Sequence, residues 1–242
     1  MFKSLKNVIF ALFITALSLQ AANKEISKSE IAQIESLTLF KNASIKVVKG
    51  FDLGSIYALK IEVKGKQDTI FLTKDKEVFI TGGMLINPKT HSQITMPVDL
   101  ALLKDKEDFV YGNGKDEYVL FTDLECPYCK KLESYLPQIK DKVKIRFFYY
   151  PLDFHKKAGA LSLYVMSKKT QQEKIDAMFN IKEQDISKIE KMTFSKELQD
   201  KLDQHIQLGV SLGVQGTPAL FDKDGVSITW LNLLYKYGIE VK

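Results

Sequence analysis

The residues best suited to chemistry are the two cysteines of the chain, which stand together in the tetrapeptide Cys126-Pro127-Tyr128-Cys129. A thiolate attacks a disulfide sulfur through a mixed-disulfide intermediate, and a second thiol nearby can then displace the partner. With no other cysteine in the sequence, a disulfide-stapled scaffold and a four-cysteine zinc module are both excluded. The tetrapeptide therefore indicates redox chemistry in which the two thiols act together.

The position of the tetrapeptide assigns different roles to its two thiols. It follows a short apolar run at residues 118–121, and we expect it to begin a helix. Unpaired backbone N–H groups and the helix dipole stabilise a thiolate at that end. Cys126 is the predicted nucleophile, exposed at the helix start, and Cys129 is the predicted resolving thiol behind it. Pro127 fits the first turn, where its missing N–H would have no intrahelical partner.

Charged residues on both sides of the tetrapeptide act on the thiolate in opposite directions. Lys130 and Lys131 favour it, whereas Asp123 and Glu125 oppose it if their carboxylates lie close. We expect the helix terminus to prevail.

Two other interpretations of the cysteine pair are half of a zinc site and a buried structural pair. Zinc takes about four ligands, and only His91, His155 and His205 are available, none at metal-ligand spacing. Each histidine is expected to be a surface or helix-packing residue rather than a catalytic base. We therefore expect no metal and no cofactor, and a cysteine hydrolase is not favoured.

Composition limits the class of protein. The 242 residues are 45% apolar and 27% charged, which is typical of a globular protein with two modest domains rather than of a disordered chain. The formal net charge of +5 is small, and lysines alternate with glutamates along the chain. This pattern does not predict nucleic-acid binding.

The N-terminal segment, residues 1–21, is predicted to be a secretory signal peptide. Residues 1–7 hold two lysines and no acid, residues 8–19 are almost wholly apolar, and Gln20-Ala21-Ala22 then supplies small residues. An uncleaved membrane anchor is the alternative. In either case the protein is exported, and a dithiol in an oxidising compartment stays reduced, or cycles, only with a dedicated partner.

Residues 22–88 are predicted to form a small α+β domain. A short amphipathic helix is expected at residues 27–39, followed by strands at residues 44–49, 56–63, 69–72 and 77–81. With fewer than about 70 residues its core is thin. Dimerisation through this domain is therefore expected.

A linker helix within residues 89–110 is predicted to join this domain to a second one at residues 111–242. The linker pattern covers residues 97–109. The second domain is predicted to begin with a β-α-β unit, whose strands lie at residues 118–121 and 143–150 around the helix that starts at Cys126. A helical region, a hairpin and a last helix are expected at residues 154–212, 219–229 and 230–237.

Two long motifs carry a resemblance to a known family. Residues 121–132, FTDLECPYCKKL, and residues 208–219, LGVSLGVQGTPA, resemble the DsbC/DsbG family of periplasmic disulfide isomerases, and the likeness covers nearly the whole mature chain. It implies a C-terminal thioredoxin fold with a helical insertion. It also implies a cystatin-like N-terminal domain that forms a V-shaped homodimer.

The resemblance further implies roles and partners. Cys126 would attack an incorrect disulfide, Cys129 would offer an escape route, and Thr217 with cis-Pro218 would face the dithiol and bind substrate backbone. Pro127 and Tyr128, between the cysteines, would modulate the site. The implied partners are misfolded or reduced exported proteins and a membrane electron-transfer protein of the DsbD type.

One departure keeps other functions open. Members of that family usually have Gly-Tyr between the cysteines, whereas this chain has Pro127-Tyr128, which also resembles glutaredoxins and is close to the Pro-His of DsbA oxidases. A periplasmic isomerase or reductase is the leading interpretation. The alternatives are a DsbA-like oxidase, a chaperone-like module that binds unfolded exported chains, and specialised reduction of an apocytochrome.

Overall fold

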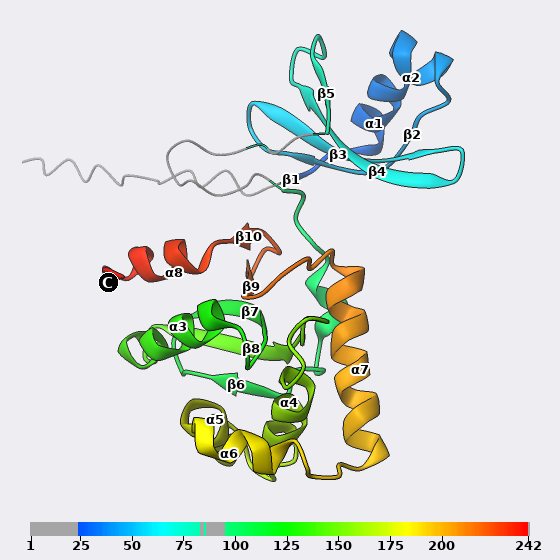
Figure 1. The fold of residues 1–242 in the computed structure, drawn as a ribbon. Helices are drawn as coiled ribbons and strands as arrows, with labels where there is room; N and C mark the ends of the chain where they lie inside the picture. The colour runs from blue at the N-terminus through cyan, green and yellow to red at the C-terminus, as the bar shows by residue number, and fades with distance from the viewer. Residues whose placement is uncertain (1–23, 83–84, 86–94, 242) are drawn as a thin grey trace, which may run out of the picture.

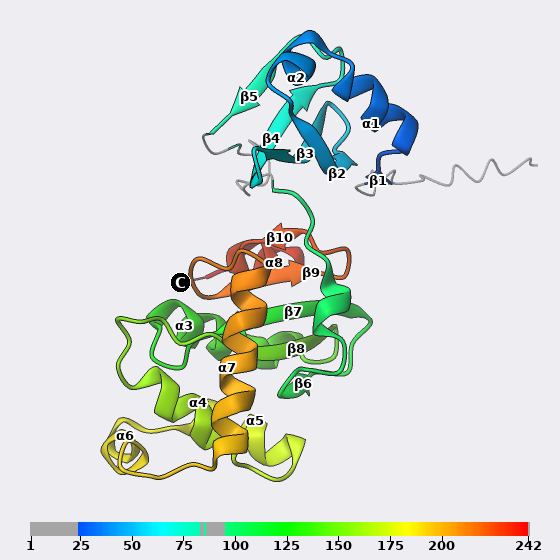
Figure 2. The same cartoon turned by 90° about the vertical axis from the view of Figure 1, so that its right-hand side faces the viewer.

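The computed structural model describes residues 24–82, 85 and 95–241, which form two units that are each built on their own sheet (Figures 1 and 2). The predicted signal peptide lies outside the described residues, and so does His91. Across the part that is described, every helix is too short or too polar to cross a lipid bilayer.

The first unit is an antiparallel sheet with two short helices. Its strands follow each other in the order β1-β2-β3-β4-β5. The elements are β1 (Lys24–Glu25), α1 (Lys28–Glu35), α2 (Thr38–Asn42), β2 (Lys46–Asp52), β3 (Ile56–Val63), β4 (Lys66–Thr73) and β5 (Phe79–Thr81). All four predicted strands are confirmed, and Leu59, Ile70 and Leu72 bury one face of the sheet against Ile34 and Phe40 of the helices.

The helix predicted over residues 27–39 is instead two helices. It begins as expected, because Ser27 and Glu30 form a capping box in which each side chain bonds the other's backbone N–H. It ends at Ser36, whose hydroxyl donates to the carbonyl of Gln33, and Leu37 is extended at φ −60° and ψ 142°. Side-chain bonding to the backbone of this kind competes with helix propagation.

The linker helix predicted over residues 97–109 is wrong. The segment contains one 3-10 turn, Leu100–Leu103, capped by the Asp99 side chain, which accepts from the N–H of Ala101. Asp105 then has a positive φ of 57°, a conformation that stops a right-handed helix. The charged residues that follow lead into Phe109–Tyr111, which form strand β6 because they pair with β8.

The second unit is a mixed sheet with helices on both faces. Its strand order is β10-β9-β7-β8-β6, with β7 parallel to β8 and the other neighbours antiparallel. The remaining strands are β7 (Asp116–Thr122), β8 (Val143–Tyr149), β9 (Ala219–Asp222) and β10 (Ser227–Ile228). The predicted β-α-β unit and the hairpin are confirmed.

The helices of the second unit account for the predicted helical region and the last helix. They are α3 (Pro127–Tyr135), which continues as a 3-10 turn at Leu136–Ile139, then α4 (Ala158–Met166), α5 (Gln171–Asn180), α6 (Glu183–Ile189), α7 (Lys196–Ser211) and α8 (Trp230–Lys236). Helices α4, α5 and α6 gather beyond the β6 edge of the sheet, and α7 runs along one side (Figures 1 and 2).

Strand β7 is buried on both faces of the sheet. Because its position is fixed by this packing, so is the start of the helix that follows it. Tyr118 and Leu120 point into the larger core, which α3, α4 and α8 cover, whereas Val119 and Phe121 point into a second core beneath the end of α7. Because alternate residues of a strand face opposite sides, this run of apolar residues supplies both cores. The carboxyl end of β7 then leads directly to the dithiol.

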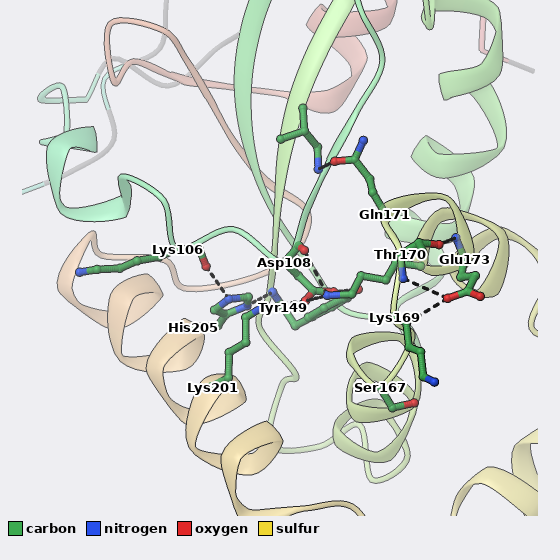
Figure 3. Close-up of polar contacts among 12 residues, drawn as sticks. Lys106, Asp108, Tyr149, Ser167, Lys169, Thr170, Gln171, Glu173, Lys201 and His205 are labelled. Atoms are coloured by element: carbon green, nitrogen blue, oxygen red, sulfur yellow. Dashed lines mark hydrogen bonds and ion pairs between the residues drawn. The ribbon is translucent and has the colours of Figure 1, made fainter.

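A buried carboxylate ties the helices to the sheet. The side chain of Asp108 is fully buried, and its Oδ1 accepts from the ammonium groups of Lys174 and Lys201 at 2.6 and 2.8 Å (Figure 3). The Tyr149 hydroxyl donates to Oδ2 at 3.2 Å. Asp108 thereby joins α5 and α7 to β8.

Beside this group lies His205, a fully buried residue of α7. Its Nδ1 accepts from the Tyr149 N–H at 3.1 Å, and its Nε2 donates to the carbonyl of Lys106 at 2.8 Å (Figure 3). Burial lowers the pKa of His205 to about 4. His205 is therefore a neutral helix-packing residue, as expected.

Candidate active site

Both cysteines lie at the start of α3, shortly after the end of β7 in the chain. Cys126 is the N-cap residue, with φ −68° and ψ 123°, and Pro127 occupies the first helical turn. This is the placement predicted from the sequence. Backbone N–H groups at the beginning of α3 are therefore available to a thiolate at Cys126.

Cys126 is less accessible than predicted. We expected an exposed thiol, but only 4% of the residue is exposed. The reason is the segment before β9: the Cys126 thiol donates to the carbonyl oxygen of Thr217, with 3.4 Å between sulfur and oxygen. The predicted nucleophile is therefore covered where the start of α3 meets this segment.

Cys129 lies behind Cys126 and is fully buried. The Asp123 N–H donates to its sulfur at 3.5 Å. Burial raises the pKa of Cys129, and the negative charge of Glu133 raises it further. Both cysteines are free, so the resolving residue is held here as a protonated thiol.

Glu133, which sequence reasoning missed, is the buried acid nearest in the chain to this thiol. It follows Cys129 by one turn of α3, on the same buried face, and accepts a 2.7 Å hydrogen bond from the Thr122 hydroxyl. Burial raises the pKa of Glu133 to about 8. The signal in the sequence was a glutamate on the apolar stripe of α3, next to Leu132.

Asp123 organises the loop that precedes the dithiol. Its side chain is fully buried, and its Oδ1 accepts from the N–H groups of Glu125 and Cys126 at 2.8 and 3.2 Å. Oδ2 accepts from the Leu152 N–H at 2.8 Å and bonds Nδ1 of His155 at 2.8 Å. The carboxylate that was expected to oppose the thiolate is thus held by four hydrogen bonds.

The same contacts bring the loop between β8 and α4 into the site. Besides the bonds to Asp123, the Oε2 of Glu125 accepts from the Lys157 N–H at 2.8 Å. His155, expected on the surface or against a helix, is instead a member of the site, with 17% of its side chain exposed.

Thr217 and Pro218 lie against the dithiol, and the peptide bond between them is cis, as the resemblance implies. The Thr217 hydroxyl oxygen is buried and has no hydrogen-bond partner among the described residues. Upstream, the Tyr150 hydroxyl donates to the Val214 carbonyl at 3.1 Å and positions this segment.

These groups are suited to exchange between thiols and disulfides. One thiol lies at a helix N-terminus, the other is buried behind it, and a carboxyl group that can hold or accept a proton near neutral pH lies on the same helix face. No cluster of three or more His, Cys, Asp or Glu side chains that could hold a metal ion occurs in the described ranges.

A family model described as a thioredoxin-like domain matches residues 103–232. The thiol:disulfide interchange protein DsbC of Dickeya dadantii is 26% identical over 232 residues, which cover 91% of this chain and 88% of that protein. A probable thiol:disulfide interchange protein DsbC of Bordetella pertussis is 27% identical over 196 residues, 73% of this chain and 64% of that protein.

Among solved structures, the catalytic domain of Proteus mirabilis ScsC aligns with a TM-score of 0.45 and 22% identity, over 56% of this chain and 93% of that domain. Pseudomonas aeruginosa DsbA2 aligns with a TM-score of 0.39 and 19% identity, over 50% of this chain and 84% of that protein.

Proposed function

This chain belongs to the thioredoxin-like domain family, and from that premise we propose that it reduces and isomerises incorrect disulfides in exported proteins through Cys126 and Cys129. The coarser statement, that it is a thiol:disulfide oxidoreductase, follows from the family and from the relatives named DsbC.

The observation that carries the proposal is the complete burial of Cys129. An oxidase passes on the Cys126–Cys129 disulfide when a substrate thiolate attacks Cys126 and Cys129 leaves. A thiol leaves faster the lower its pKa, and burial raises the pKa of Cys129. The burial of Cys129 therefore supports the proposal of reduction and isomerisation over donation of the disulfide.

The first step is attack by the Cys126 thiolate on a substrate disulfide. A bond forms between Cys126 and one substrate sulfur, the substrate S–S bond breaks, and the second substrate sulfur leaves as a thiolate. Thr217 and Pro218, beside the Cys126 sulfur, would bind the substrate backbone in this complex.

The mixed disulfide then has two outcomes. In isomerisation a thiolate of the substrate attacks its own sulfur, forms the new disulfide and releases the Cys126 thiolate. In reduction Cys129 gives its proton to the Glu133 carboxylate, attacks the Cys126 sulfur and expels the substrate thiolate, so that the enzyme is oxidised and the substrate reduced. A reductant of the DsbD type would restore the dithiol.

The N-terminal domain, residues 22–88, is proposed to form a homodimer, and residues 89–110 to connect it with the catalytic domain at residues 111–242. Large apolar side chains on that domain are about half exposed, namely Leu39 at 50%, Val48 at 50% and Val78 at 53%. Burial of such surface against a second copy is favourable. A sedimentation mass of one mature chain at micromolar concentration would contradict this part of the proposal.

The experiment that tests the function is thiol trapping of the exported protein in cells. We expect Cys126 and Cys129 to be mostly reduced, because an isomerase must start from the thiolate. A mostly oxidised pair would indicate a DsbA-like oxidase, and the likeness of Pro127 to the proline of those oxidases would then be the decisive feature of the motif. If the Cys126→Ala, Cys129→Ala double variant keeps the biological activity, the chain acts as a chaperone-like binding module instead.

A further inference from the structure

The two most exposed large apolar side chains in the described ranges belong to segments that form the candidate site. Phe154 is 71% exposed and Tyr128 is 64% exposed, more than any other large apolar residue there. Tyr128 lies between the two cysteines, and Phe154 lies in the loop that joins β8 to α4. Exposed apolar side chains on segments that border a reactive group indicate a surface for contact with another molecule.

Phe154 is held in place rather than carried on a free loop. The residues on both sides of it are fastened: Leu152 and His155 to the carboxylate of Asp123, and Lys157 to that of Glu125. One carboxylate, that of Asp123, therefore separates the His155 ring from the amide of Cys126.

The Phe154 ring contributes little to the fold of its own unit. It packs edge-on against His155, its neighbour in sequence, with 4.5 Å between ring centroids, and it is absent from the cores on both faces of the sheet. An aromatic ring that is fixed in position yet left in water gains most of its burial on association.

Exposed lysines follow the two aromatic residues closely in the sequence. Lys130 and Lys131 follow the dithiol on α3, and Lys156 and Lys157 follow Phe154. Lys131 lies one turn after Tyr128 and so on the same face of the helix.

Two acidic residues, Glu125 and Asp153, lie in the same segments as these lysines. The carboxylate of Glu125 accepts from the backbone, and Asp153 is the exposed acid of the loop. The Lys156 ammonium donates to the Asp153 carbonyl at 2.7 Å. The four lysines outnumber these two acids, so the segments combine exposed apolar side chains with net positive charge.

We propose that Phe154 and Tyr128, with the lysines beside them, select disulfides whose cysteine is flanked by a bulky apolar side chain and a carboxylate. The proposal rests on the proposed function, since it concerns the substrate of the same dithiol. The rings would cover the apolar side chain, and the lysines would attract the acid at distances within the Debye length of about 8 Å at physiological salt.

The test uses the full chain, returned to the dithiol after each turnover by reduced glutathione, and a set of short peptides, each closed by one disulfide. The rate with glutathione alone is subtracted. One peptide carries Leu and Asp beside a cysteine, a second has Ser in place of Leu, and a third has Lys in place of Asp. The enzymes are wild type, Phe154→Ala, Phe154→Leu and Lys156→Glu. Tyr235→Ala is the matched control, because Tyr235 is 55% exposed on α8, whose last turn is bonded to Asp116 at the far end of β7.

We expect Phe154→Ala to raise KM for the Leu-Asp peptide about tenfold with kcat nearly unchanged, as for the loss of an apolar contact. Phe154→Leu should restore most of the binding. Lys156→Glu should weaken binding of the Leu-Asp peptide and improve that of the Leu-Lys peptide, and added salt should reduce both effects. Tyr235→Ala should match wild type.

A small disulfide without flanking residues, Ellman's reagent, separates the two proposals. If Phe154→Ala slows its reduction as much as that of the peptide, or leaves KM for the Leu-Asp peptide unchanged, the selection proposal is overturned while the thiol chemistry stands. If wild type reduces neither Ellman's reagent nor any peptide, the proposed function itself fails.

Discussion

The Thr122 hydroxyl donates a 2.7 Å hydrogen bond to Oε1 of Glu133 in the interior of the second unit, where Cys129 is also buried. This bond joins the last residue of β7 to the helix that carries both thiols. It holds an ionisable carboxyl group on the buried face of α3 that also carries Cys129.

Replacement of Cys129 by Ala should trap the reaction at its first intermediate. Without the resolving thiol, the enzyme itself can no longer expel the substrate, so mixed disulfides that no substrate thiolate releases should accumulate on Cys126. Non-reducing gels of cell extracts, followed by mass spectrometry of the adducts, measure this. Cys126→Ala is the control and should trap none, and the opposite pattern would reverse the two roles.

Glu133→Gln should slow resolution of the mixed disulfide about 10- to 100-fold, as expected for loss of a proton acceptor. The pKa of Glu133 is raised to about 8, so its carboxylate fraction, and with it the wild-type rate, should rise as the pH approaches 8. The variant should lack this rise in stopped-flow measurements. Glu117→Gln, at an exposed carboxylate of β7, is the control, and identical pH profiles for Glu133→Gln and wild type would exclude the role.

Glu133 should also make the fold less stable at alkaline pH. Its pKa is about 8 when folded and 4.5 when unfolded, so its contribution to stability is complete below 4.5 and lost as the pH rises through 8. Between pH 5 and pH 9 wild type should lose about 2 to 5 kcal/mol that Glu133→Gln does not lose. Urea unfolding at both values measures the difference, and parallel curves would refute the expectation.

His205 should have the opposite effect on the acidic side. The pKa is about 4 in the folded chain, against 6.5 for an ordinary histidine, so the unfolded state binds the proton first. Its contribution to stability is complete above pH 6.5 and declines as the pH falls to 4, by up to about 3 kcal/mol. Denaturant unfolding of His205→Gln should show a weaker decline than wild type over this range. An equal decline would mean that other groups cause it.

Asp123→Asn should release the loop that carries Phe154. Its Oδ1 can still accept from the amide of Cys126, but an amide NH2 in place of Oδ2 would face the N–H of Leu152, a donor against a donor. We expect a loss of about 1 to 3 kcal/mol and faster proteolysis within residues 152–157, measured by limited digestion. Asp153→Asn, at an exposed neighbour, should leave both unchanged.

The sequence predicts the parts of the site whose positions follow from local rules. The dithiol at a helix N-cap follows from the short apolar strand before it and from Pro127, and the structure has both. The prediction of a linker helix over residues 97–109 was wrong, because the pairing of β6 with β8 and the positive φ of Asp105 outweigh the helical pattern of its leucines.

His155 could not be found from periodicity, because its partner lies 32 residues earlier in the chain and only the tertiary fold brings the two together. Glu133 left a weak signal, a charged residue on an apolar helix face. Its proximity to Thr122 depends on how α3 packs against β7, and helical spacing does not determine that packing.

The burial of Cys126 carries an expectation about which disulfides the dithiol can reach. With 4% of the residue exposed and its sulfur bonded to the Thr217 carbonyl, we expect disulfides on loose, extended segments to react faster than cross-links that a folded protein holds rigidly in its interior. Under the proposed function, a client that reaches its native structure would then escape further exchange, and its own rigidity would protect its correct pairings.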